Sequence, residues 1–191
     1  MPEILPEPLT TIARTFGAPG LTLRDHGPRH WKCVALTGLR LAELDPAIDM
    51  GVVYAFAQLH DSQRLNEYGD PEHGPRAADV TLEAIEGAGL PRFEPNSERA
   101  GRLLYAIREH TAAGCSEDPT IGACWDADRL NLWRVGIEPA IRFMSTRPAR
   151  EHFDELSEWA MELIEGPEPT WANVARACRP TAGPDVEPLA P

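Results

Sequence analysis

The segment that most constrains the fold is residues 45–61, "DPAIDMGVVYAFAQLHD". Drawn as a helix, it is apolar on most of its sides, at Ile48, Val52, Val53, Phe56 and Leu59. A helix of this kind needs other elements packed around most of its circumference. The segment therefore predicts a central helix within a larger bundle.

Helical periodicity recurs along the chain, and sustained strand alternation is nearly absent. Helices are expected over residues 25–44, 46–59, 73–89, 97–114, 118–136 and 146–166, several of them closed by glycine. At the first of these, Asp25 or His26 can cap the helix and Pro28 suits its first turn. The expected fold class is an all-α, single-domain bundle of about five to seven helices.

The two ends of the chain differ from its middle. The start, "MPEILPEPLT", is acidic and rich in proline, and the end, "RPTAGPDVEPLAP", is again rich in proline. We therefore expect an N-terminal extension over residues 1–20, a helical domain over 21–166 and a disordered proline-rich tail over 167–191.

Composition excludes several classes of partner. The 191 residues carry a formal net charge of -12, which would repel nucleic-acid polymers and acidic membranes. A small phosphorylated ligand held by local cations remains compatible with this charge. There is no signal-peptide pattern, no apolar run near the roughly 20 residues of a membrane span, and no CxxC pair among the four cysteines. We expect a cytoplasmic protein with reduced thiols, either a monomer or a homodimer.

The central segment ends on His60 and Asp61, side by side. Successive side chains of a helix point about 100° apart, but at a helix end both can converge on a small object. A divalent metal is such an object, because imidazole and carboxylate are both good ligands for it. A histidine and an aspartate at a helix end are also compatible with an ordinary C-terminus and turn.

Three other features accompany this pair: His30 upstream in "HGPRHWKCV", Asp128 downstream in "DADRL", and the apolar helix before "HD". The order H…HD…D, with its elements on different expected helices, resembles the HD-domain superfamily of metal-dependent phosphohydrolases. The similarity covers about Arg24 to Gly136. It implies a compact HD-type helical domain in which His30, His60, Asp61 and Asp128 bind a metal.

Two of these positions have rivals nearby. His26 stands four residues before His30 and shares its helix face, but "HWKCV" matches the superfamily pattern, so His26 is expected to act as a cap. Asp126 is the rival to Asp128. The superfamily's ligand usually comes directly before the residue that continues the helix, so Asp126 is expected to support the ligands or orient a water.

The ligand types implied by the resemblance suit hydrolysis. Two imidazoles and two carboxylates leave open positions on a hexacoordinate ion, where water would lose a proton more readily and a phosphoryl oxygen would be polarised. The ion could be Mn, Fe, Co, Ni, Mg or Zn, and one or two ions could bind. Asp61 could also bridge to a second ion or accept the proton of the water.

Three further residues are candidates for the site. His73 in "DPEHG" and His110 in "LLYAIREHT" could bind a second metal or a phosphate, although either could be an ordinary surface histidine. Arg64, close after the HD pair, could bind a substrate phosphate bidentately, or it could be a solvated arginine paired with Glu67 or Asp70. The expected catalytic residues are Asp61, His73 and Arg64.

The remaining residues near these motifs are expected to be structural. Arg129 is expected to be solvated or paired with a carboxylate, Cys124 and Trp125 to lie in the core or a pocket wall, and His152 to lie on the surface. Lys32 stands where arginine is common in the superfamily.

The leading functional hypothesis is a metal-dependent phosphohydrolase acting on a small phosphate ester, most plausibly a nucleotide. A diiron oxidase on the same scaffold is the second hypothesis, since His73 and His110 could supply the extra ligands it needs. A third is a non-catalytic HD module that binds a metal, a ligand or a partner.

Overall fold

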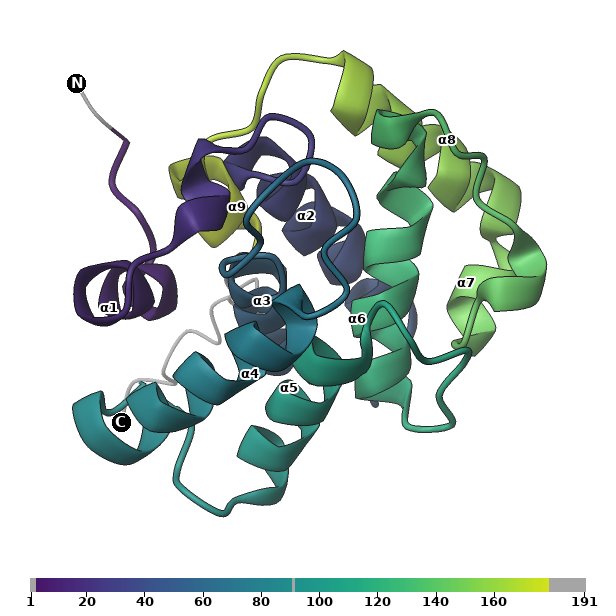
Figure 1. Cartoon of the computed structure of the whole chain (residues 1–191). Helices are drawn as coiled ribbons and strands as arrows, with labels where there is room; N and C mark the ends of the chain where they lie inside the picture. Colours follow the sequence, from purple (N-terminus) through teal and green to yellow (C-terminus); the bar gives the residue numbers. More distant parts are fainter. Residues whose placement is uncertain (1–2, 91, 179–191) are drawn as a thin grey trace, which may run out of the picture.

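Helices joined by turns and loops make up the described part of the chain, residues 3–90 and 92–178, and no strand occurs there. This computed structural model contains nine α-helices within those residues: α1 (Glu7–Thr15), α2 (Pro28–Leu44), α3 (Met50–Leu59), α4 (His73–Glu83), α5 (Glu98–Glu109), α6 (Pro119–Leu130), α7 (Arg147–Glu151), α8 (Phe153–Glu165) and α9 (Trp171–Ala177). Four short helical turns join them: η1 (Pro19–Thr22), the π turn η2 (Ala84–Ala88), η3 (Asn131–Val135) and η4 (Ile141–Phe143). The predicted all-α fold class is confirmed (Figure 1).

Helix α3 lies at the centre of the bundle, as its apolar pattern predicts. From Val52 to Leu59 every residue except Tyr54 is buried. The helix packs against α1, α2, α5 and α6. Asp49 caps its first turn by accepting the backbone N–H groups of Gly51 and Val52. The C-terminal end of this central helix is thereby placed deep in the protein.

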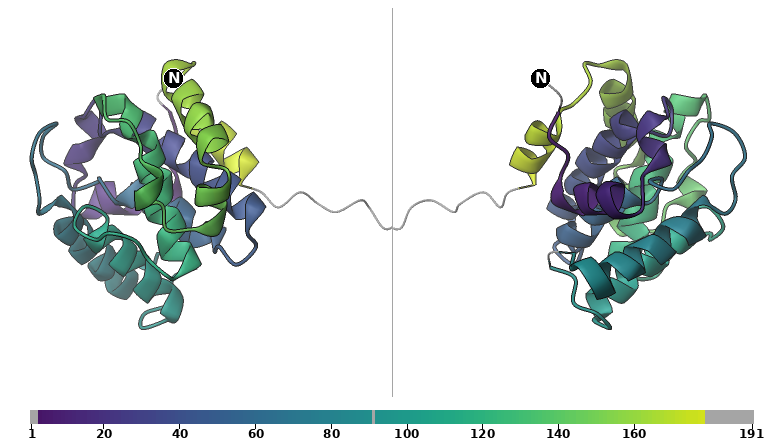
Figure 2. Two further views of the ribbon diagram at one scale, coloured as in Figure 1. Left: turned by 90° about the vertical axis from the view of Figure 1, so that its right-hand side faces the viewer. Right: turned by 60° about the vertical axis from the view of Figure 1, so that its left-hand side comes forward.

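Helix α2 packs closely along α3, and Gly38 permits this approach. A Cβ atom at Gly38 would lie 2.3 Å from Cγ1 of Val53, which is shorter than any real contact. Helices α4 and α5 form a neighbouring pair on one side, and α8 packs against α2 and α6 on the other (Figures 1 and 2). Elements distant in sequence therefore meet around the end of α3.

The expected boundaries at residues 20 and 166 do not separate the chain ends from the bundle. Helix α1 buries Leu9 and Ile12 in the core, and α9 buries Trp171 and Val174 against it. The prolines near the start suited a helix N-terminus, because Pro6 is the N-cap residue of α1. The expected extension and the start of the expected tail are therefore parts of the helical domain. The remainder of that tail, residues 179–191, lies outside the described residues.

Buried Lys32 forms ion pairs with residues near both ends of the described chain. Its Nζ lies 2.7 Å from a carboxylate oxygen of Glu3 and 2.7 Å from one of Glu168. A buried ammonium group requires such partners. Lys32 thus has a structural contact to both ends of the domain.

The expectation of five to seven helices was too low. It omitted α1 and α9, and it treated residues 146–166 as one helix. The structure divides that segment into α7 and α8 at His152, whose φ and ψ of -116° and 30° interrupt the helix. His152 is exposed, as expected.

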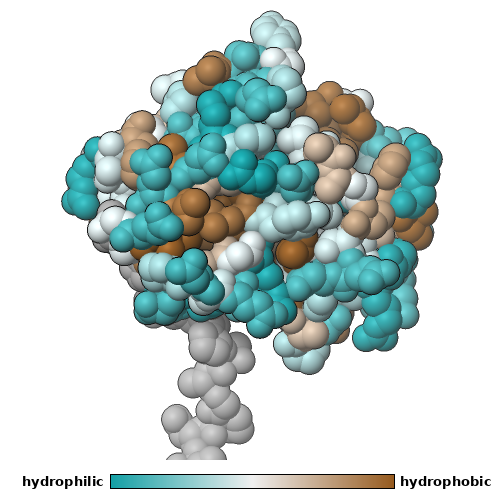
Figure 3. All heavy atoms as spheres, turned by 60° about the horizontal axis from the view of Figure 1, so that its bottom comes forward, coloured by the Kyte–Doolittle hydropathy of each residue, from teal (hydrophilic) through white to brown (hydrophobic). Residues whose placement is uncertain are grey.

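The surface is mixed in character. On the face shown in Figure 3, hydrophilic side chains separate several apolar patches, as is usual for a folded domain. Among the described residues, none of the helices is long and apolar enough to cross a membrane.

Candidate metal centre

Six buried or half-buried histidine and aspartate side chains meet at the end of α3. They form two triads, each with its ligand atoms within 4.8 Å of one another: His30, His60 and Asp128, and Asp61, His73 and His110. The first triad joins α2, the end of α3 and α6. The second joins the residue after α3's C-cap to the start of α4 and the end of α5. All four expected ligands and both expected extra histidines are therefore brought together.

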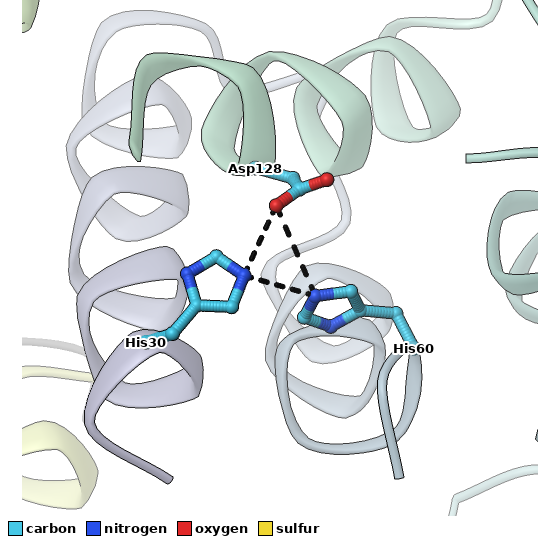
Figure 4. A group of neighbouring side chains, drawn as sticks. All are labelled: His30, His60 and Asp128. Carbon is cyan, nitrogen blue, oxygen red and sulfur yellow. Dashed lines mark hydrogen bonds and ion pairs between the residues drawn. The ribbon is translucent and has the colours of Figure 1, made fainter. Parts of the chain in front are cut away.

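The first triad converges on one point (Figure 4). Nε2 of His30 lies 3.2 Å from Nε2 of His60 and 3.1 Å from Oδ1 of Asp128. Nε2 of His60 lies 3.9 Å from the same oxygen. Three lone-pair donors directed at a common point are the arrangement that a cation requires.

The second triad has the same character. Nε2 of His73 lies 2.9 Å from Oδ1 of Asp61 and 2.8 Å from Nε2 of His110. Gly74 allows α4 to start this close to α5, because a Cβ atom there would lie 2.9 Å from the carbonyl oxygens of Ile107 and Arg108. Gly74, directly after His73, thus allows the imidazoles of His73 and His110 to approach each other.

Asp61 connects the two triads. Its Oδ1 faces His73 and His110, at 2.9 and 3.7 Å, while its Oδ2 lies 3.6 Å from Nε2 of His60 and 4.0 Å from Nε2 of His30. One carboxylate oxygen therefore points to each triad, which is the geometry of a bridging ligand.

Backbone carbonyls select the tautomer of three of the four imidazoles. In His60, His73 and His110, Nδ1 lies within hydrogen-bond distance of the carbonyl oxygen three or four residues earlier. These acceptors belong to Phe56, Asp70 and Ile107 respectively. Donation from Nδ1–H leaves Nε2 unprotonated and directed into its triad, as a metal ligand must be.

Electrostatics favour neutral imidazoles at His30 and His60, whereas Asp61 raises the pKa of His110 against the effect of burial. Burial lowers the pKa of His30 to about 3 and that of His60 to about 4, so both are neutral near pH 7. Burial acts to raise the pKa of Asp61, but the neighbouring His60 and His110 outweigh it and hold that pKa well below its usual value. Burial also acts to raise the pKa of Asp128, but His30 and Arg134 outweigh burial and hold that pKa well below its usual value. Neutral imidazoles and ionised carboxylates are the forms that bind metals.

Two carboxylate oxygens lack the hydrogen bonds that buried groups normally make. Oδ1 of Asp61 and Oδ1 of Asp128 have no partner with hydrogen-bond geometry among the described residues. An unsatisfied buried acceptor costs about 1–3 kcal/mol, and more when it is charged. A cation in each triad would satisfy both oxygens, so the residues present fit a divalent metal with nitrogen and oxygen ligands.

Asp126 and His26, the alternatives to Asp128 and His30, belong to neither triad. Asp126 is fully buried and accepts hydrogen bonds from the backbone N–H groups of Ser145 and Thr146, each at 2.7 Å, and from the Thr146 hydroxyl at 2.8 Å. It holds the segment before α7, and the expectation that it supports the ligands is wrong. His26 does not cap α2, whose N-cap is Gly27. Its Nδ1 lies 3.3 Å from Oδ2 of Asp61, so it borders the metal centre.

From the sequence, Arg64 and Arg129 could each be solvated or paired with a nearby carboxylate, and the structure gives both of them other contacts. Arg64 is buried, and its Nη1 lies 3.8 Å from Oδ1 of Asp61. Of its two expected partners, Asp70 instead pairs with Arg76, and Glu67 accepts hydrogen bonds from the backbone N–H groups of Arg24 and Asp25. Arg129 donates to the carbonyl oxygens of Ala113 and Phe143, at 2.7 and 2.8 Å. Arg64 likewise donates to the carbonyl oxygens of Asn66 and Tyr68, so backbone carbonyls orient both guanidinium groups.

The cysteines and the tryptophan follow the expectation. Cys124 and Trp125 are buried in the core. All four cysteines lie within the described residues, and none forms a disulfide.

Arg134 is a site residue that the sequence did not reveal. Its Nη2 lies 3.7 Å from Oδ1 of Asp128 and 3.4 Å from Nδ1 of His26. No motif singles it out, because it follows Asp128 on the separate turn η3, whose direction depends on tertiary packing. Only its position in "DADRLNLWRVG", within the segment that continues from a ligand, could have drawn attention to it.

The centre opens to solvent through a cleft of about 410 Å³. Asp61, His73, His110 and Asp128 line it, together with Arg64 and Arg134. His30 and His60 lie behind this lining, buried in the bundle. A small molecule in the cleft would therefore meet both triads from one side.

No protein-family model, curated protein or solved structure matches this chain. The function must accordingly be argued from the motifs and from the geometry of the centre.

Proposed function

We propose that this chain is an HD-type, metal-dependent phosphohydrolase with two divalent cations at the end of α3. One cation would lie among His30, His60 and Asp128, the other between His73 and His110, with Asp61 shared. The observation that carries the proposal is the division of the Asp61 carboxylate between two adjacent triads. Paired divalent cations in one site commonly serve displacement at phosphorus.

Bound cations of this kind supply Lewis acidity and make a coordinated water more acidic. In the proposed reaction, water adds to phosphorus, the bond from phosphorus to the ester oxygen breaks, and a proton passes to the leaving alcohol. The chain's own contribution is positioning. Backbone carbonyls keep the imidazole Nε2 atoms unprotonated, and Arg64 and Arg134 place positive charge at the cleft where a phosphoryl group would gain negative charge.

Metal identity, number of ions and activity can be tested together. Freshly purified protein should contain about two metal ions per chain, and with Mn, Co, Ni or Mg it should release phosphate from a panel of nucleotides and other phosphate esters. His73→Ala should reduce the metal content to about one ion, because it removes a ligand of one triad only. Asp61→Asn should abolish hydrolysis. His152→Ala, at an exposed histidine away from the centre, is the matched control and should leave both unchanged. Failure of every ester with every metal would refute the proposal.

A diiron oxidase is the second candidate, and the completeness of the second triad favours it. Four imidazoles and two carboxylates exceed the ligand set expected for a single hydrolytic ion. An oxidase would hold about two iron ions per chain and consume oxygen with its substrate, whereas the hydrolase would work under argon. Metal content without turnover of either kind would indicate a binding module.

A further inference from the structure

Each triad has an arginine at its cleft side, and the two arginines are held in the same way. In Arg134, Nε donates to the carbonyl oxygen of Asp25 at 2.8 Å and Nη1 to that of Asn131 at 2.9 Å. The remaining nitrogen, Nη2, lies 3.7 Å from Oδ1 of Asp128. Two nitrogens of the guanidinium are thus fixed by the backbone, and the third points to a metal-ligand candidate.

Arg64 repeats this arrangement at the other triad. Its Nε donates to the carbonyl oxygen of Asn66 at 3.1 Å and its Nη2 to that of Tyr68 at 2.6 Å. Its Nη1 lies 3.3 Å from Nδ1 of His73 and 3.8 Å from Oδ1 of Asp61. The side chains of Arg64 and Arg134 are 11% and 10% exposed, and both are held in place before any ligand arrives, so little side-chain entropy would be lost on binding.

The net positive charge expected at the metal-loaded centre favours binding of an anion. Two divalent cations and two guanidinium groups would exceed the charge of Asp61 and Asp128 by about four, in a largely buried place. The histidines do not compensate, since a metal-binding imidazole is neutral. A ligand with one negative charge would leave most of this excess, whereas a terminal phosphoryl dianion would remove about half of it.

The rest of the cleft includes three apolar side chains and the carboxylate of Glu67, and both features favour an organic group without negative charge. Leu132, Val135 and Ile137 line it, and Val135 and Ile137 are 36% and 53% exposed. The remaining arginine of the lining, Arg129, differs from Arg64 and Arg134 because both of its Nη atoms donate to carbonyl oxygens, those of Phe143 and Ala113. Among the residues that line the cleft, no further cation is therefore free for a second phosphate.

We propose that Arg64 and Arg134 together hold one terminal phosphoryl dianion over the two triads, while Leu132, Val135 and Ile137 contact the organic part of the substrate. The substrate class is a phosphomonoester with an uncharged, partly apolar alcohol, in place of a phosphodiester or a polyphosphate. The inference rests on the two-cation part of the proposed function. The net charge of -12 agrees with it, since a polyanion would be repelled at long range.

Calorimetric titration of the metal-loaded full chain tests this without turnover. The ligands are inorganic phosphate, phenylphosphonate, whose P–C bond is not hydrolysed, and diphenyl phosphate. Arg134→Gln and Arg64→Gln should each weaken phosphate binding about 10- to 100-fold at unchanged metal content, because each removes a charge-assisted hydrogen bond. Arg134→Lys should lose less than Arg134→Gln. Arg40→Gln, at an exposed arginine paired with Glu43 and Glu155, should bind as the wild type does.

The same experiment tests separately whether Leu132, Val135 and Ile137 contact the organic part of the ligand. Phenylphosphonate should bind more tightly than inorganic phosphate, and Ile137→Ser should reduce that advantage without weakening phosphate itself. Diphenyl phosphate, which has a single charge, should bind worst.

Four outcomes would overturn the inference: no phosphate binding by the wild type, unaltered phosphate binding in both arginine variants, loss of metal in Arg134→Gln, or a preference for the diester. Loss of metal would mean that Arg134 positions Asp128 and does not bind the ligand. Phosphate binding as described, without hydrolysis of any ester, would leave this inference intact and refute the proposed hydrolase.

Discussion

Replacing Asp126 with alanine should destabilise the fold and leave the metal centre intact, in contrast to replacing Asp128. Asp126 accepts three short hydrogen bonds from Ser145 and Thr146. A hydrogen bond to a charged group contributes about 1.5–3 kcal/mol, and three that share one carboxylate are not additive. Burial raises the pKa of Asp126, and the donors oppose that shift only in part. The three hydrogen bonds together therefore contribute well below the sum of their separate values to the free energy of unfolding.

We therefore expect Asp126→Ala to lower the free energy of unfolding by about 3 kcal/mol, a large part of the roughly 5–15 kcal/mol of a typical domain. For a chain of this length the melting temperature should fall by about 10 °C. Asp126→Asn should lose about half as much, because its amide oxygen can still accept from Ser145 while its NH2 group would face a second donor.

Urea titration of the metal-free protein measures the stability, and elemental analysis of folded protein measures the metal. Asp128→Asn should lose metal, whereas Asp126→Ala should keep it. Asp79→Ala removes an exposed carboxylate paired with Arg108 and should change the stability by less than about 1 kcal/mol. Loss of metal from Asp126→Ala at an unchanged urea midpoint would refute the assignment of the two aspartates.

The remaining predictions concern metal removal, pH and thiol reactivity. Chelation should lower the melting temperature, because a ligand that binds only the native state stabilises it; equal melting curves with and without chelator would contradict this. The metal-free protein should lose stability as the pH falls from about 6.5 to about 4, since burial lowers the pKa of His30 and His60 and the unfolded chain then binds more protons. His110, whose pKa is raised by Asp61 against the effect of burial, opposes this with one group against two; urea midpoints that are flat over this range would refute it. Alkylation of the native protein should label exposed Cys115 and spare buried Cys33, whose pKa burial raises to about 11, with mass mapping as the measurement.

Local patterns were sufficient for the helices with strong apolar periodicity. Helix α3 was expected at the centre because apolar residues cover most of its sides, and the burial of Val52 to Leu59 bears this out. Patterns failed where the signal was composition instead of periodicity. Proline in the first and last segments suggested tails, yet α1 and α9 each bury apolar side chains. Short amphipathic helices are stabilised mainly by the surface they pack on, which local sequence does not show.

The sequence by itself determined that this chain forms a helical bundle and that His30, His60, Asp61 and Asp128 belong together. The bundle follows from helical periodicity, and the grouping of the four residues is what the motif order implies through its resemblance to the HD-domain superfamily. Tertiary structure alone decided that His73 and His110 form a second triad with Asp61 and that Asp126 faces Ser145. It also decided that Arg134 lies beside Asp128. The physical reason is that these relations depend on distances between side chains of separate helices, and those distances are set by how the helices pack and not by their spacing along the chain.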